Sequence, residues 1–471
     1  MLKTLCGTKR LWPAKVAGIA VLAGTLSSCN LDVSDPDIVT PDDVADPASL
    51  PIAIAGVVGD FQLMLDSYAR YSGMSIDEFI LSGTFPTRAQ VDERNVLSDN
   101  ATLTGGLYEI IHVARFSADN LVQAVSSLVG DPDVDQDLVS QALAIGQFYG
   151  AYVRVLLAEL YCQSILGGGD ELNPNYESSP KSPDERAQDA LSRFQAAEAS
   201  ATAIGAADLA DAARVGQARA NMWLGNYAAA ASTVASVATG FEFEAAYSSN
   251  DPSQYNDVYQ LTYGDNAAIR WTVGDGTQIE RNFEKFAYYD EFLAVGLIFQ
   301  DPSTTDYNSF NSAIRLQLQM IYPPPRASGE PQLSPTANGQ SSPIIAASGF
   351  EARIMEAEAQ YRAGDVAGAE SKINALLTTG LNPHGAMFAP VDLTGVFATD
   401  IDQIGYAYSV GAWLTGHRFG FVRRVLRNDN VDLFPAVQPG NDTAFPVVKQ
   451  ELDNNPDINQ ACPSGAPGSW S

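Results

Sequence analysis

Histidine and basic side chains are scarce in this sequence. The 471 residues include three histidines, and 56 acidic side chains outnumber 27 basic ones, which gives a net charge of -29. So few imidazoles limit metal sites and acid–base chemistry that depend on histidine. A surface of this charge repels phosphate backbones, so nucleic acids and strongly anionic substrates are poor partners.

Signature motifs of catalysis and metal binding are also missing. The chain has no Gly-x-Ser-x-Gly, His-Glu-x-x-His, Gly-x-x-x-x-Gly-Lys-Ser/Thr or Cys-x-x-Cys. Asp131-x-Asp133-x-Asp135 starts like a calcium-binding loop, but Gln136 replaces the required glycine and Ala142 the bidentate glutamate. We therefore expect no enzyme activity, catalytic residue, metal or cofactor. A glycosidase stays open as a lesser alternative, because carboxylates are abundant.

A long apolar run is missing as well, but a short one lies near the start. Residues 16–26 form an apolar run of 11 residues behind four basic residues. A helix of that length crosses about half of a bilayer's hydrocarbon core. Leu26-Ser27-Ser28-Cys29 follows and resembles the bacterial lipobox. We therefore interpret residues 1–28 as a lipoprotein signal peptide and Cys29 as the lipidated residue; an ordinary secretory peptide is the alternative.

Cysteine is rare in the rest of the chain. Beyond Cys29, the mature protein contains Cys162 and Cys462. These two could form a disulfide in an oxidising compartment. The alternative is two separate thiols, with Cys162 buried on an apolar helix.

Helical periodicity begins after a segment that is rich in Asp and Pro. Residues 29–51 are interpreted as an extended tether, because their prolines oppose a helix. Apolar residues three and four apart then predict helices over 52–71, 105–127 and 138–164. Ser182-Pro183-Asp184-Glu185 is a capping box, which predicts a helix that begins there and runs to about Ala203.

Two stretches of the sequence repeat each other. Residues 209–238 and 349–378 each place an alanine seven residues before a glycine, Gly225 or Gly364, and another alanine five residues after it. We predict two helical hairpins in which the glycine ends the first helix with positive φ, while Asn226 or Asp365 caps the second. The turns resemble those of tetratricopeptide repeats, and two unrelated hairpins are the alternative.

The region between the hairpins has a different composition. Residues 240–345 contain short β-like runs, many turn residues and many aromatic residues. We expect a second loop-rich insertion at 381–408, a last helix over about 409–427, and irregular structure after it.

Four pieces of the sequence together resemble the SusD/RagB family of outer-membrane lipoproteins. They are the lipobox with residues 30–33, the paired hairpin turns, the Thr415-Gly416-His417-Arg418 segment that continues to Arg424, and residues 445–456 with Phe445-Pro446. Val448 departs from this family pattern, in which a second proline is usual. We expect His417 and Arg418 to pack and form ion pairs, not to catalyse.

The resemblance implies a fold, a location and a partner. The fold would be mainly α, with tetratricopeptide-like hairpins as a scaffold, in one SusD-like domain over 52–471. The protein would be lipid-anchored in the outer membrane, facing outward, and would deliver an oligosaccharide or a peptide to a SusC-like TonB-dependent transporter. The alternative function is a lipid-anchored helical-repeat scaffold on the periplasmic side that binds only protein.

Aromatic residues in 240–345 are the candidate ligand contacts. Sugar rings stack their C–H faces on aromatic rings, and Tyr288-Tyr289-Asp290-Glu291 offers both rings and polar groups. We therefore predict that Trp271, Tyr288, Tyr289 and Tyr307 contact ligand; the alternative is that these rings fill a core. The negative charge favours a neutral or cationic ligand over an anionic one.

Overall fold

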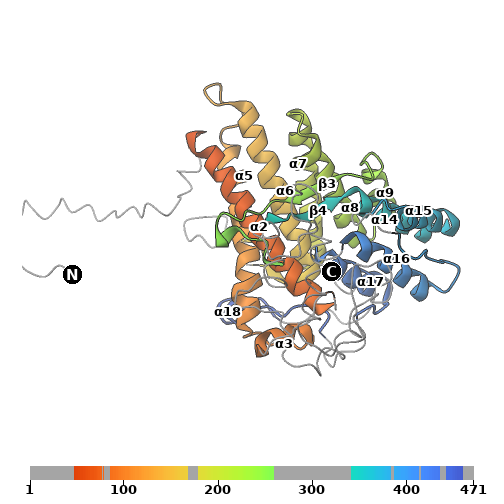
Figure 1. The fold of residues 1–471 in the computed structure, drawn as a ribbon. Helices are drawn as coiled ribbons and strands as arrows, with labels where there is room; N and C mark the ends of the chain where they lie inside the picture. The colour runs from red at the N-terminus through yellow and green to blue at the C-terminus, as the bar shows by residue number, and fades with distance from the viewer. Residues whose placement is uncertain are drawn as a thin grey trace, which may run out of the picture.

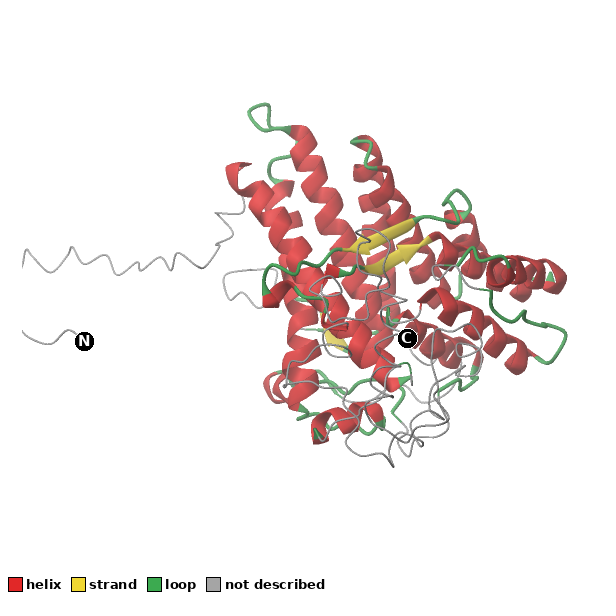
Figure 2. Ribbon diagram, viewed as in Figure 1, coloured by secondary structure: helices red, strands yellow, loops and turns green. Residues whose placement is uncertain are grey.

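The structure is a computed structural model that describes residues 47–76, 78, 85–167, 179–258, 341–382, 387–412, 415–434 and 442–459. Helices make up most of this part of the chain, and its strands are short (Figure 2). The predicted mainly α fold class is therefore confirmed. The signal peptide, most of the tether and residues 259–340 lie outside the described residues.

Long helices from the first half of the chain pack side by side from the left to the middle of Figure 1. They are α2 (Leu50–Ser75), α5 (Glu109–Ser126), α6 (Gln136–Leu160), α7 (Pro183–Ala203) and α8 (Ala207–Trp223). Short elements precede or connect them: η1 (Pro47–Ser49), α3 (Pro86–Asp92), α4 (Ala101–Leu103), and the π-helical turn η2 (Thr104–Tyr108). The main hydrophobic core contains residues from α2 through to Val448.

Helix α2 begins two residues earlier than predicted. Pro51 occupies its first turn, where a backbone N–H has no helical acceptor, so the proline is tolerated. With η1, the helix is long and apolar enough to cross a membrane by length and composition alone. Its second half is instead buried in the core, as Tyr68 and Leu65 illustrate.

The start of α7 was predicted correctly, whereas α6 begins at Gln136, two residues earlier than predicted. Asp135 caps α6, so this aspartate of the calcium-like sequence accepts hydrogen bonds from backbone amides. The capping box of Ser182 and Glu185 is present at α7, which ends at Ala203 as predicted. Helix α6 ends at Leu160 instead of residue 164, because Tyr161 adopts an extended conformation and pairs with Phe445.

Both predicted hairpins are present. Helix α8 is followed by α9 (Tyr227–Val234), and α14 (Gly349–Arg362) by α15 (Val366–Thr378). Gly225 and Gly364 have φ of 77° and 90°, and a Cβ at either would meet no atom within 4 Å. Asp365 caps α15 as predicted, whereas the side chain of Asn226 makes no capping hydrogen bond to α9.

Two small antiparallel sheets accompany the helices. One pairs β1 (Ser164–Ile165) with β2 (Pro180–Lys181). The other pairs β3 (Glu242–Ala245) with β4 (Ile344–Ser348), and η3 (Pro252–Gln254) follows β3. The β-like run at 268–273 lies outside the described residues.

The C-terminal part differs most from the prediction. The expected single helix over 409–427 is two helices, α16 (Phe397–Ala412) and α17 (His417–Asp429). Gly416 precedes α17 with φ of 81°, and a Cβ there would overlap Tyr68 and Ala69 of α2, so the break places α17 close against α2. Helix α16 also occupies half of the expected insertion at 381–408. The tail contains α18 (Lys449–Asn454), so residues after 427 are not wholly irregular.

Candidate ligand-binding face

The predicted ligand contacts Trp271, Tyr288, Tyr289 and Tyr307 lie outside the described residues, as does Cys29. Their contact with ligand and the lipidation therefore stay predictions. What the structure does show is how the segment that contains these aromatics is attached to the scaffold.

Cys162 lies just after α6, where its side chain is buried. It is disulfide-bonded, and an Nη of Arg423 lies 3.7 Å from its sulfur. Cys462 lies outside the described residues, so the pairing of these two cysteines also stays a prediction.

The two ends of residues 259–340 are joined at one place, which we call the insertion base (residues 242–258 and 341–348). Strands β3 and β4 pair from Glu242 with Ser348 to Ala245 with Ile344. Beyond the strands, Nδ2 of the buried Asn256 donates a hydrogen bond of 2.7 Å to the carbonyl of Ser342. The insertion therefore leaves and re-enters the described structure at neighbouring points.

Helix α2 holds the insertion base through polar contacts. The hydroxyl of Tyr247 donates to the carbonyl of Gln62 at 2.8 Å. Arg70 forms an ion pair of 3.4 Å with Asp257, whose backbone N–H donates to Asp66 Oδ2 at 3.3 Å. Burial raises the pKa of Asp66 to about 7, although Arg70 opposes that rise. The insertion base is thus fixed to a helix of the core. Loops that carry binding residues are usually held by a rigid scaffold in this way.

An aromatic side chain near α2 was missed by the sequence reasoning. Phe85 is 43% exposed and precedes α3, and the guanidinium of Arg88 lies 4.4 Å from its ring centroid. Arg88 interacts in turn with Tyr71 and Arg70 of α2. Phe85 is therefore an exposed ring that Arg88 links to α2. In the sequence, Phe85 stood out only by its position directly before Pro86, a proline that can begin a helix.

A second group of polar side chains is buried between α2, α6, α8, α14, α16 and α17; we call it the buried polar cluster. It consists of Arg219, Glu351, Tyr408, His417, Tyr152, Glu159 and Tyr68. Arg219 donates to Glu351 through Nε at 2.5 Å and Nη2 at 2.6 Å, and the Tyr408 hydroxyl donates to the same carboxylate at 2.5 Å.

Histidine in this cluster is neutral. Arg219 Nη2 lies 3.0 Å from His417 Nδ1, which therefore accepts. Tyr152 donates its hydroxyl proton to the carbonyl of Ala346, so its oxygen accepts from His417 Nε2 at 2.6 Å. Burial first, and Arg219 second, hold the pKa of His417 well below its usual range.

Glu159 is the carboxylate of the cluster whose pKa is raised. The Tyr68 hydroxyl donates to its Oε2 at 2.9 Å, and burial raises the pKa of its carboxyl to about 7. Perturbed groups of this kind often mark active sites. Here the cavity beside Glu159 and Arg219 measures about 20 Å³, which is room for a single water. This cavity is too small for a substrate, and the cluster joins helices. His417 and Arg418 are buried, as the sequence predicted, but neutral His417 forms hydrogen bonds instead of the predicted ion pair, and Arg418 donates to the carbonyl of Ile76.

Comparisons with known proteins identify the fold. No family model and no curated protein matches the chain. Among solved structures, surface glycan-binding protein A from Bacteroides uniformis superposes with a TM-score of 0.57 at 11% identity, covering 90% of this chain and 100% of that one. A SusD-like carbohydrate-binding protein from Bacteroides vulgatus gives 0.57 at 12% identity over 88% and 97%. A laminarin-binding SusD-like protein gives 0.53 at 14% identity over 87% and 98%. The chain therefore has the SusD-like fold, as predicted.

Proposed function

We propose that this protein captures an oligosaccharide at the cell surface, breaks no bond in it, and delivers it to a SusC-like TonB-dependent transporter. The observation that carries the proposal is the SusD-like fold, which extends over nearly the whole chain and is shared with structures described as glycan-binding. A peptide is the alternative ligand.

The insertion base supports a capture role. A large aromatic-rich segment begins and ends at the insertion base, which Tyr247 and Asp257 fix to helix α2 and in which Asn256 is bonded to Ser342. Exposed loops on a rigid scaffold are the usual location of binding residues. The net charge of -29 disfavours an anionic ligand, so a neutral sugar chain fits the protein best.

The lipobox at Cys29 supports attachment to the outer membrane. A triacylated N-terminus buries enough methylene groups for stable anchoring without a membrane-spanning helix. A lipid-anchored protein that binds a nutrient needs a route across the membrane, and a TonB-dependent transporter would supply it.

The binding proposal is tested with the full-length protein extracted in detergent. Laminarihexaose and maltohexaose are titrated calorimetrically into the wild type, and their integrity afterwards is checked by mass spectrometry. The Tyr288→Ala/Tyr289→Ala variant should bind at least about tenfold more weakly, since an anchoring aromatic contributes ~1.4 kcal/mol or more. The Tyr288→Phe/Tyr289→Phe variant keeps both rings and should retain most of the affinity.

Three results would contradict the proposal. If neither glycan binds and no TonB-dependent transporter co-purifies from membranes, the protein-binding scaffold is favoured. If the glycans are shortened, the protein is a glycosidase. If the double alanine variant unfolds, the tyrosines belong to a core.

A further inference from the structure

The turns of the two hairpins and the start of α16 line an open, solvent-accessible cavity of about 650 Å³, which we call the hairpin cavity. This is within the usual range for small-molecule sites. Its lining includes Tyr227, Tyr361, Arg362, Leu393, Phe397 and Asp400.

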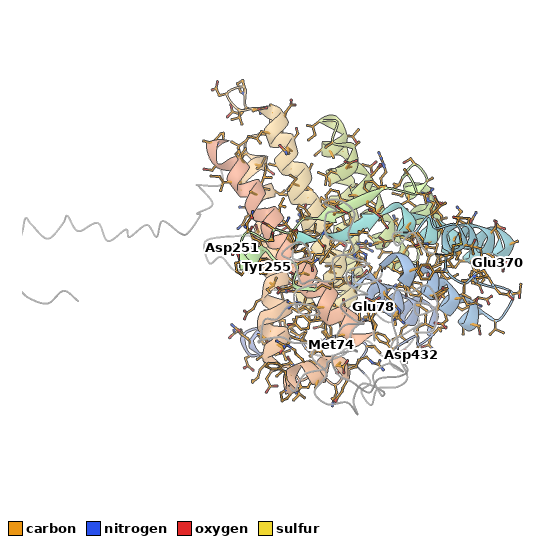
Figure 3. All side chains as sticks on the ribbon, viewed as in Figure 1. Met74, Glu78, Asp251, Tyr255, Glu370 and Asp432 are labelled. Atoms are coloured by element: carbon orange, nitrogen blue, oxygen red, sulfur yellow. The ribbon has the colours of Figure 1, made fainter. Side chains whose placement is uncertain are left out.

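The hairpin cavity is remote from the insertion base. The backbone N–H of Leu393, which lines the cavity, donates to Glu370 Oε2 at 2.9 Å. Figure 3 shows Glu370 at one end of the molecule and Asp251 and Tyr255, which belong to the insertion base, toward the other. A ligand in this cavity would thus meet a different part of the scaffold.

Arg362 is held rigidly in the cavity wall. Its two Nη atoms donate to Asp429 at 2.8 and 2.7 Å, and its Nε donates to Glu358 at 2.8 Å. The guanidinium carbon lies 4.1 Å from the ring centroid of Tyr227 and 5.5 Å from that of Phe397. The arginine therefore fixes two aromatic rings and has its own charge compensated.

The rim of the cavity is fixed by Asp400, which is 2% exposed. Its Oδ2 accepts the Tyr361 hydroxyl at 3.0 Å, and its Oδ1 accepts the backbone N–H of Gly395 at 3.0 Å. The rings of Tyr361 and Phe397 lie 6.0 Å apart, inclined by 31°. Phe397 is 38% exposed, so one part of its ring remains open.

These groups disfavour an anionic ligand. An anion would face the carboxylates of Asp400, Asp429 and Glu358, and Arg362 is already paired with two of them. A pyranose fits, because its C–H face can stack on Phe397 while its hydroxyls can donate to the Tyr361 oxygen or the Asp400 carboxylate.

We propose that the hairpin cavity is a second saccharide-binding site, with Phe397 as the stacking surface and Tyr361, positioned by Asp400, as the polar contact. This inference rests on the proposed glycan capture. It adds a contact on the helical scaffold, remote from the insertion base, so that one long glycan or two shorter ones bind at two places.

Hydrogen–deuterium exchange with laminarihexaose and with maltohexaose locates the site. At saturation, peptides that cover 391–400 and 358–366 should become protected in the wild type. They should also become protected in Tyr288→Ala/Tyr289→Ala, which leaves the hairpin cavity intact. Phe397→Ala should need about tenfold more glycan than the wild type to reach the same protection. Tyr361→Phe keeps the ring and should weaken it less. Leu381→Ala is the matched control, because Leu381 is 60% exposed and does not line the cavity.

The outcomes separate this inference from the proposed function. If a glycan binds the wild type but leaves 391–400 unprotected, or if Phe397→Ala changes nothing, the second site does not exist and the capture proposal stands. If neither glycan binds any of the proteins, both proposals fall. If Phe397→Ala and Tyr361→Phe keep the thermal midpoint of the wild type, their loss of protection comes from lost binding and not from unfolding.

Discussion

Replacing Glu159 by glutamine should change the way in which the stability of the protein depends on pH. The carboxyl is 8% exposed, accepts one hydrogen bond from Tyr68, and has a pKa raised from 4.5 to about 7 by burial. Between these two values the folded state holds a proton that the unfolded state has lost. The contribution of Glu159 to stability is therefore complete below pH 4.5 and is lost as the pH rises toward 7.

The size of this loss follows from the shift in pKa. A rise from 4.5 to about 7 corresponds to roughly 3 kcal/mol, at about 1.4 kcal/mol per unit. Glutamine does not ionise, and its amide oxygen can still accept the Tyr68 hydroxyl. At each pH we compare the free energy of unfolding of Glu159→Gln with that of the wild type. Relative to the wild type, the variant should become more stable by roughly 3 kcal/mol between pH 4.5 and pH 7.5.

Urea unfolding of both proteins at several pH values between 4.5 and 7.5 measures this difference. Asp66, whose pKa is also raised to about 7, titrates in both proteins, so its effect cancels. Glu351→Gln is the matched control from the same cluster. It leaves Arg219 buried without its carboxylate and should destabilise the protein at pH 7.5 by about 3–5 kcal/mol. A difference between Glu159→Gln and the wild type that does not change with pH would refute the reasoning.

Three further predictions concern the backbone, the disulfide and the lipid. Gly364→Val should lower the free energy of unfolding by ~1–2 kcal/mol through backbone strain alone, since φ is 90° and the site is open. Gly364→Asn should lower it less. Equal stability of the two variants in urea unfolding would contradict this. Peptide mapping without reduction should find Cys162 linked to Cys462, and a different partner would disprove the pairing. Intact-mass analysis should find the mature protein starting at acylated Cys29, and another N-terminus or release without detergent would exclude the lipoprotein interpretation.

Local signals were enough to predict several elements from the sequence. A capping box depends on residues three apart, so Ser182 and Glu185 identified the start of α7. Left-handed glycines end helices wherever the chain must turn, so Gly225 and Gly364 identified both hairpins. Asn226 shows the limit of such reasoning, because its side chain makes no capping hydrogen bond.

Contacts between distant segments decided the rest. The sequence over 409–427 has a helical pattern on both sides of Gly416, and the structure breaks the helix there, where Gly416 has positive φ and lies against Tyr68 of α2. Tyr161 leaves α6 early because it pairs with Phe445. Neither partner lies within reach of a local sequence pattern, so neither boundary was predicted.

The buried polar cluster and the hairpin cavity depend on tertiary structure in the same way. Arg219 and Glu351 are 132 residues apart, and as isolated residues each is typical of an exposed helix face. The rings around the hairpin cavity come from the ends of three helices: Tyr227 of α9, Tyr361 of α14 and Phe397 of α16. Only the packing of those helices brings the rings together. The sequence by itself determined where helices begin and turn, because those choices depend on neighbours a few residues away. The positions of buried charges and of the cavity were decided by tertiary structure, because they depend on which helix faces meet.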